Sequence, residues 1–307
     1  MSQAVFVSGL THGDLLAFPL TLVLGVVVGL LDAGSMARRR VAVALAMLSF
    51  LPPFFVSPEH SAVRLLTAMA TVMVVLRSID LCVDGRPWSA ARRVWLMVSI
   101  WDSRRASFAA PALDGRALVR VLGFATTALV VGIGLREVST LALGQPRLLL
   151  RWLLGAAFVY VMFDALHALM IGLHRACGVV VPPFHRDPIL SRSVGEFWGT
   201  RWNMIIHDVL SRHLFRPLVR RRRPWLGVAA SFVCSGLLHA WLMFAALGVD
   251  AALRMGAYFL VQGVLFAVER PLGVLRWRSA IRRTWTVVAV LGPSPLFTEP
   301  LITTLGF

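Results

Sequence analysis

The sequence lacks lysine altogether and contains little charge of either sign. All 31 basic residues are arginine, and charged residues make up 15% of the 307 positions. Hydrophobic residues make up 58%, and the mean hydropathy is +0.75. About a quarter of the residues in an ordinary soluble domain are charged, so this composition excludes a soluble globular protein. It indicates an integral membrane protein, which we expect in a bacterial inner membrane.

Short motifs for several common chemistries are also absent. No CxxC pair, HExxH motif or His/Cys cluster at ligand spacing occurs, so the sequence predicts no metal site. It has no G-x-S-x-G motif and no glycine-rich phosphate loop, which argues against hydrolases and nucleotide-binding proteins. The three cysteines, Cys82, Cys177 and Cys234, are odd in number and fall in expected cytoplasmic loops or a membrane helix. We therefore expect no disulfides.

Long apolar runs divide the chain into candidate membrane spans. A spanning helix needs about 20 apolar residues. We expect eight spans, at residues 14–31, 41–57, 62–77, 118–135, 148–171, 226–247, 252–268 and 284–304. The second and third are short, and the last contains Pro293, Pro295 and Pro300. With no internal repeat or soluble domain evident, the sequence predicts an all-α, polytopic single membrane domain over residues 1–307, with interfacial helices in its cytoplasmic loops.

The distribution of arginine predicts an orientation in the membrane. Cytoplasmic loops of membrane proteins carry most of the basic residues. With eight spans, the arginines gather in the loops after the first, third, fifth and seventh spans, and the opposite loops hold Arg64, Arg136, Arg147, Arg151 and Arg254. We therefore expect both termini outside the cytoplasm. Because membrane orientation also accounts for the sequence pI near 11.7, we expect membrane lipids and no nucleic acid as partners.

The long loop between the fifth and sixth spans contains a segment rich in Trp and Arg, residues 197–223. On a helix at about 100° per residue, its apolar side chains form one arc: Trp198, Trp202, Ile205, Ile206, Val209 and Leu210. A polar stripe lies beside this arc: Thr200, Asn203, His207 and Ser211. We expect an in-plane helix whose polar side faces a cavity mouth or water. The alternative is a solvated polar face on an interfacial helix.

Two expected spans carry rows of polar residues at helical spacing. The rows are Ser231, Ser235 and His239 in the sixth span, and Tyr160, Asp164, His167 and His174 in the fifth. Ionisable groups at membrane depth usually face a protein cavity or a substrate path. The rows therefore predict a hydrated or substrate-filled interior. The alternative is that these groups satisfy one another as hydrogen bonds between helices.

Two blocks of the sequence resemble a known family. The first reads F-W-G-T-R-W-N from Phe197 to Asn203, and the second reads S-G-L-L-H from Ser235 to His239. In this order, with an arginine-rich connector, they resemble the wax synthase branch of the membrane-bound O-acyltransferases over about residues 193–247. The resemblance implies a multi-helix membrane fold that transfers an acyl group from acyl-coenzyme A to a hydroxyl group. It also implies that His239 is the catalytic histidine and Asn203 the second catalytic polar residue.

The chain departs from the family pattern at one position. Many relatives have an acidic residue directly after the histidine, where this chain has Ala240. The acceptor alcohol therefore need not be the same. The same chemistry on a sterol or secondary-metabolite hydroxyl is an alternative, and a transporter in which Asp164, His167 and His239 relay protons is another.

The chemistry of an acyl transfer suits these residues. A thioester is already activated, so the protein has to make the alcohol more nucleophilic and bring two hydrophobic substrates together. An imidazole with a reference pKa of ~6.5 can remove the hydroxyl proton as attack proceeds, and Asn203 can polarise the thioester carbonyl. No cysteine is placed as an acyl carrier. We therefore expect direct transfer in a ternary complex, with acyl-CoA as co-substrate and no permanently bound cofactor.

Further residues are candidates for binding acyl-CoA or the hydrophobic alcohol acceptor. They are Arg201, Trp198, Trp202, His207, Ser235, Asp164 and His167. Arg201 suits a phosphate of coenzyme A, because a guanidinium group matches phosphate geometry. A structural ion pair is the alternative for this arginine.

Overall fold

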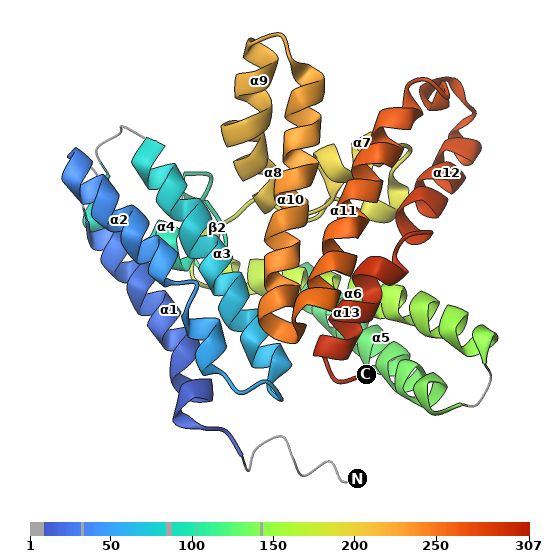
Figure 1. Ribbon diagram of the computed structural model, residues 1–307, viewed down its shortest axis with the longest axis horizontal. Helices are drawn as coiled ribbons and strands as arrows, with labels where there is room; N and C mark the ends of the chain where they lie inside the picture. Colours follow the sequence, from blue (N-terminus) through green and yellow to red (C-terminus); the bar gives the residue numbers. More distant parts are fainter. Residues whose placement is uncertain (1–8, 32–33, 84–87, 103, 142–143) are drawn as a thin grey trace. The chain divides into compact units, whose positions relative to one another are not determined.

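The computed structural model describes residues 9–31, 34–83, 88–102, 104–141 and 144–307 (Figure 1). Helices form nearly all of the regular structure in these residues, and the two-residue strands β1 (Ser107–Phe108) and β2 (Val179–Val180) pair antiparallel. The all-α, polytopic fold predicted from the sequence is confirmed.

Six helices within the described residues are long and apolar enough to cross a membrane. They are α1 (His12–Leu30), α3 (Ser61–Val83), α5 (Gly115–Thr140), α6 (Gln145–Ala176), α10 (Pro224–Leu247) and α11 (Val249–Glu269). Each contains one of the predicted spans or most of it. The third span, which is short as an apolar run, is part of a helix of 23 residues.

The second and eighth predicted spans are each divided between two shorter helices. Residues 41–57 contain much of α2 (Met36–Leu48) and the short helix η2 (Pro52–Phe55). Residues 284–304 contain parts of α12 (Ser279–Leu291) and α13 (Pro295–Thr304). Both breaks fall beside prolines, which cannot donate a backbone hydrogen bond and clash with the preceding helical turn. Apolar composition over a window does not register such a break, which explains the difference from the predicted count.

Contacts divide the chain into two compact units. Unit 1 comprises residues 1–104 and 240–252, and unit 2 comprises residues 105–239 and 253–307. In unit 1, helices α1, α2, α3 and α4 (Ala90–Val98) surround an apolar core that includes Val28, Val74 and Leu96. Gly29 lets α4 approach α1 closely, because a Cβ atom at this position would lie 2.8 Å from the Cα atom of Val94.

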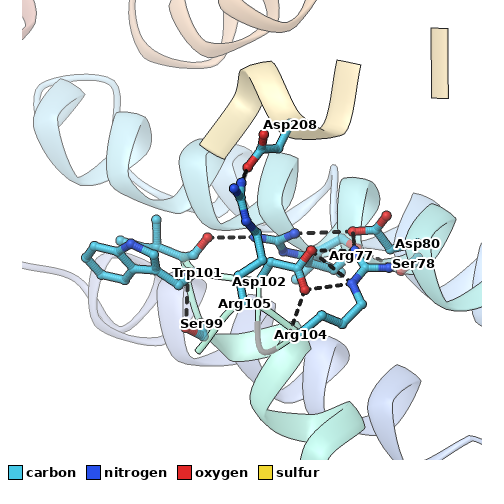
Figure 2. Close-up of polar contacts among 11 residues, drawn as sticks. Arg77, Ser78, Asp80, Ser99, Trp101, Asp102, Arg104, Arg105 and Asp208 are labelled. Atoms are coloured by element: carbon cyan, nitrogen blue, oxygen red, sulfur yellow. Dashed lines mark hydrogen bonds and ion pairs between the residues drawn. The ribbon is translucent and has the colours of Figure 1, made fainter. Parts of the chain in front are cut away.

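A buried ionic cluster in unit 1 joins the end of α3 to the segment after α4 (Figure 2). Arg77 is 1% exposed and donates hydrogen bonds to Asp80 over 3.2 Å and to the carbonyl oxygen of Ile100 over 2.7 Å. Arg104 donates to Asp80 over 2.8 Å and to Asp102 over 2.6 Å. Burial acts to raise the pKa of Asp102, but the hydrogen bonds from Arg104 outweigh it and hold that pKa below its ordinary value. These pairings offset the free energy of burying the charges.

Unit 2 contains helices α5 and α6, which pack along each other (Figure 1), and the C-terminal helices α12 and α13. Its short helices are η3 (Pro188–Leu190), α7 (Val194–Glu196), η4 (Phe197–Arg201), α8 (Met204–Leu210), η5 (Ser211–Phe215), α9 (Arg216–Arg220) and η6 (Val274–Arg276). Helices α10 and α11 contribute residues to both units.

The prediction of one continuous helix over residues 197–223 is wrong. The helix breaks at Asn203, whose φ of 43° and ψ of 62° lie in the left-handed region. Two of the pieces, η4 and η5, are wider π-helical turns. Such turns shift the direction of every later side chain. Three residues of the polar stripe, Asn203, His207 and Ser211, line one cavity together with Ile206 and Leu210 of the apolar arc.

Candidate active site

A cavity of about 330 Å³ lies within unit 2, between residues 195–215, here called the motif segment, and helices α10 and α11. Its polar lining residues are Asn203, His207, Ser211, Ser231, Ser235 and His239. Its aromatic lining residues are Trp198, Trp202, Phe215, Phe232, Phe259 and Phe266. A largely apolar pocket with a few convergent polar groups is the usual form of a small-molecule site. The structure thus brings most of the predicted site residues together around one space.

His239 enters this cavity from α10 with a fixed ring orientation. Its Nδ1 atom lies 2.8 Å from the carbonyl oxygen of Ser235, one turn earlier in the helix. A carbonyl oxygen can only accept a hydrogen bond, so Nδ1 carries the hydrogen and Nε2 of the neutral ring keeps its lone pair. The ring also lies against Phe259 of α11, with 4.1 Å between the ring centroids. These two contacts hold the imidazole in one tautomer and one plane.

Gly236, next to Ser235, explains part of the S-G-L-L-H block. A Cβ atom here would lie 3.3 Å from the Cβ atom of Phe259 and 3.4 Å from the carbonyl oxygen of Gly256. Glycine therefore allows α10 and α11 to pack closely at this level. The close packing places the ring of Phe259 directly against His239.

Asn203 lies opposite the helices, at the break between η4 and α8. Asparagine tolerates the left-handed region better than most residues. Its Oδ1 atom accepts a hydrogen bond of 3.3 Å from the backbone N–H of Ile206 and so caps the first turn of α8. Because the amide oxygen has this partner, the Nδ2 group is the part of the side chain suited to donate to a ligand in the cavity.

A neighbouring segment, residues 184–186, holds the backbone on both sides of Asn203. Arg186 donates its backbone N–H to the carbonyl oxygen of Arg201 over 2.9 Å, and Met204 donates to that of Phe184 over 2.9 Å. The N–H of Asn203 itself donates to Nδ1 of His185 over 3.2 Å. Three hydrogen bonds in succession therefore fix the turn that presents Asn203 to the cavity.

Two histidines of this region outside the membrane-spanning helices, His185 and His207, have lowered pKa values. Burial, with a smaller contribution from the nearby His167, lowers the pKa of His185 to about 3. Burial also lowers the pKa of His207, and the charges of Arg216, Arg105 and Arg186 add to this effect. Both imidazoles thus act as neutral hydrogen-bonding groups near pH 7.

Two polar residues of α11 position the motif segment, and neither was singled out from the sequence. Gln262 is fully buried and accepts a hydrogen bond of 3.0 Å from the indole Nε1 of Trp198. Glu269 accepts backbone hydrogen bonds from Val194 over 2.6 Å and from Gly195 over 3.2 Å, at the N-terminus of α7. For Gln262, the signal in the sequence is an uncharged amide in the middle of an apolar span, where an unpaired polar group would be costly.

Three of the predicted substrate-binding residues do not line the cavity. Arg201 is ion-paired with Glu196 over 2.7 Å and donates to the carbonyl oxygen of Arg186 over 2.9 Å, which is the structural alternative. Asp164 is buried within hydrogen-bonding reach of Tyr160, one turn away on α6. His167 accepts a hydrogen bond of 3.2 Å from the backbone N–H of Phe184 through its Nε2 atom. This hydrogen bond therefore helps to hold residues 184–186 in place.

An ion pair also fixes the position of α8. Arg105, in the segment before β1, pairs with Asp208 on the helix (Figure 2). The preceding residue on the same helix, His207, lines the cavity. The fold and the cavity together define a multi-helix membrane protein with a histidine and an asparagine at one internal site.

Comparison with known proteins shows that part of the chain, including this site, is similar to a known family. Residues 181–261 match the model of the Membrane bound O-acyl transferase family. This range contains both sequence blocks, the segment around His185, and the cavity residues from Gly195 to Phe259. The resemblance inferred from the two blocks is confirmed for this part of the chain.

Several curated proteins are similar to part of the chain. The probable long-chain-alcohol O-fatty-acyltransferase 2 of Arabidopsis thaliana is 28% identical over 145 residues, which are 45% of this chain and 40% of that protein. The long-chain-alcohol O-fatty-acyltransferase of Simmondsia chinensis is 27% identical over 127 residues, 37% of this chain and 36% of that protein. The acyl-CoA–sterol O-acyltransferase 1 of Arabidopsis thaliana is 27% identical over 151 residues, 45% of this chain and 44% of that protein. The chain thus spans less than half the length of these relatives.

Proposed function

We propose that this protein is a membrane O-acyltransferase that moves an acyl group from acyl-CoA to the hydroxyl group of a hydrophobic alcohol. The observation that carries the proposal is the presence of His239 and Asn203 in one cavity, with the Nδ1 atom of His239 engaged by a backbone carbonyl. The imidazole then has a free lone pair on Nε2, which is the form that a general base requires.

In the proposed reaction, Nε2 of His239 takes the proton of the alcohol as its oxygen attacks the thioester carbonyl carbon. A carbon–oxygen bond forms, the carbon–sulfur bond breaks, and the proton passes from the imidazolium to the thiolate of coenzyme A. The hydrogen bond from Nδ1 to Ser235 favours the imidazolium while it exists, because both ring nitrogens are then donors. His239 returns to its starting tautomer when the thiol leaves.

Asn203 is proposed to stabilise the negative charge that develops on the thioester carbonyl oxygen. Its amide oxygen is held by Ile206, so the amide nitrogen is the group presented as a donor. A donor fixed before the reaction starts needs no reorganisation when charge develops, and removal of one such donor typically costs about 10²- to 10³-fold in turnover. The left-handed backbone at Asn203 is the structural cost of this placement.

The aromatic lining suits apolar substrates. Trp198, Trp202 and Phe259 line the same cavity as the polar groups, so an acyl chain can lie along the rings while the thioester reaches His239. Relatives that act on long-chain alcohols favour an alcohol of this kind as acceptor, and the sterol-acylating relative favours a sterol as the second candidate. Asp164 and His167 do not line the cavity of His239, which counts against the proton-relay alternative.

The test is release of free coenzyme A by purified protein in detergent, followed with a thiol reagent. We expect release from a long-chain acyl-CoA to require an added alcohol, with the ester appearing in equal amount. Long-chain alcohols and sterols are compared at the same concentration to assign the acceptor. Coenzyme A release that does not depend on any alcohol, or no release with folded protein, would contradict the proposal.

A further inference from the structure

His185 is a buried histidine outside the cavity that contacts two consecutive cavity residues. It lies between β2 and η3 and is 5% exposed. Its Nδ1 atom accepts the backbone N–H of Asn203 over 3.2 Å. Its ring lies against the indole of Trp202, with 4.3 Å between centroids and 32° between planes. One side chain therefore supports both the polar and the aromatic wall at this point.

This contact requires a hydrogen-bond acceptor at the Nδ1 position. Nδ1 can accept a hydrogen bond only when it carries no hydrogen, so the neutral ring has its hydrogen on Nε2. Within the described residues, Nε2 is buried and has no hydrogen-bond partner. A buried donor without a partner destabilises the fold. A residue that only filled space here would be more stable as an aromatic hydrocarbon.

The backbone of Asn203 needs such support. Its left-handed conformation is less favourable than the ordinary helical one and persists only where neighbouring groups hold it in place. The hydrogen bonds of Arg186 and Met204 fix the residues on either side, and His185 engages the N–H of Asn203 itself. The direction of the Asn203 side chain depends on this backbone, since the Cα–Cβ bond turns with φ and ψ.

We propose that His185 is a positioning residue for acyl transfer, acting through Asn203. Its Nδ1 atom fixes the left-handed turn so that the amide group of Asn203 meets the reacting carbonyl. Its ring also packs against the indole of Trp202. This inference rests on the proposed function, in which Asn203 stabilises the transition state.

The test compares His185→Asn with His185→Gln in the full-length protein in detergent. The amide of asparagine falls near the position of Nδ1, whereas that of glutamine falls near the position of Nε2. Both variants are polar and lose the ring, so they serve as matched partners. We expect turnover about 10- to 100-fold below wild type for His185→Gln, in line with a small displacement of a catalytic group. We expect His185→Asn to recover most of this loss, and the KM for acyl-CoA to change less than about twofold in both.

A double variant separates positioning from general stability. In an Asn203→Gly background, which keeps the left-handed backbone accessible and removes the amide, His185→Gln should lower turnover no further. A purely structural role predicts a lower melting temperature with equal turnover in the two folded His185 variants. Equal turnover, or a full additional loss in the double variant, would overturn the proposal. If Asn203→Gly alone keeps wild-type turnover, the role of Asn203 in the proposed function fails and the positioning role fails with it.

Discussion

The indole Nε1 of Trp198 donates a hydrogen bond of 3.0 Å to Oε1 of Gln262, and so joins the motif segment to α11. The amide nitrogen of Gln262 donates in turn to the carbonyl oxygen of Ala289 on α12 over 2.9 Å. Both ends of this fully buried side chain are therefore satisfied. The aromatic wall of the cavity owes its position to a polar residue that does not line the cavity.

Gln262→Leu should destabilise the protein and disturb substrate binding. It leaves the indole N–H and the Ala289 carbonyl without their partner, and each unsatisfied buried group costs about 1–3 kcal/mol. We expect a lower melting temperature in detergent and a higher KM for acyl-CoA in the protein that remains folded. Leu260→Ala, at a 53% exposed position on the same helix, is the control and should change neither quantity. An unchanged melting temperature in Gln262→Leu would show that the bond contributes nothing.

Asn203→Asp should separate the two tasks of the asparagine. The carboxylate keeps an oxygen for the N–H of Ile206 and tolerates the left-handed backbone, but it cannot donate to an oxyanion and repels one. We expect near-normal stability with turnover lower by at least about 10²-fold. Asn203→Gly should lose the helix cap and the donor together. Turnover close to wild type in folded Asn203→Asp would exclude the donor role.

Stability should fall as the pH is lowered below about 6.5, the ordinary pKa of histidine in an unfolded chain. Burial holds the pKa of His185 near 3 and also depresses that of His207. Between these values the unfolded state binds protons that the folded state does not, so unfolding becomes easier as pH falls. Each such histidine contributes at most about 1.4 kcal/mol per pH unit in this range. Melting temperatures measured from pH 7.5 to 4.5 check this, and His185→Asn should flatten the profile.

Membrane orientation can be tested with single cysteines in a variant without Cys82, Cys177 and Cys234. The arginine pattern predicts that Glu59→Cys and Thr140→Cys react with an impermeant maleimide on intact cells. It predicts that Met36→Cys and Arg223→Cys react only after permeabilisation. All four positions are exposed. Because residues 36–59 include the proline-broken pair α2 and η2, labelling of Met36→Cys and Glu59→Cys from the same side would show that this pair does not cross the membrane.

The polar half of the site could be predicted because helical spacing determines it. Ser231, Ser235 and His239 share a face of any helix that includes them, and the structure places all three on the cavity. Asn203 and His207 were found as a polar stripe, although the helix that carries them is broken. The aromatic rings of Phe259 and Phe266 were missed, since nothing in an apolar span distinguishes a cavity wall from a lipid-facing side chain.

Other features depend on contacts that no local pattern contains. His185 lies in a loop without periodicity, and its partner is a backbone N–H of a residue 18 positions away. Spacing alone does not reveal whether a polar side chain meets a protein group or a substrate. This is why the roles of Arg201, Asp164 and His167 could not be assigned from the sequence. Backbone geometry determines where the helices are interrupted, at Asn203 and at the prolines of the second and eighth predicted spans. Hydropathy therefore identifies the apolar stretches but does not show whether each is one continuous helix.

The most direct test of the central claim is the turnover of His239→Ala, measured by thiol release with saturating acyl-CoA and alcohol. The variant should elute as a folded protein, melt near the wild-type temperature and keep the wild-type affinity for acyl-CoA. Loss of a general base typically lowers turnover about 10²- to 10⁴-fold, and the account predicts a loss in this range. Folded His239→Ala that transfers acyl groups at more than about a tenth of the wild-type rate would contradict the assignment of His239 as the base.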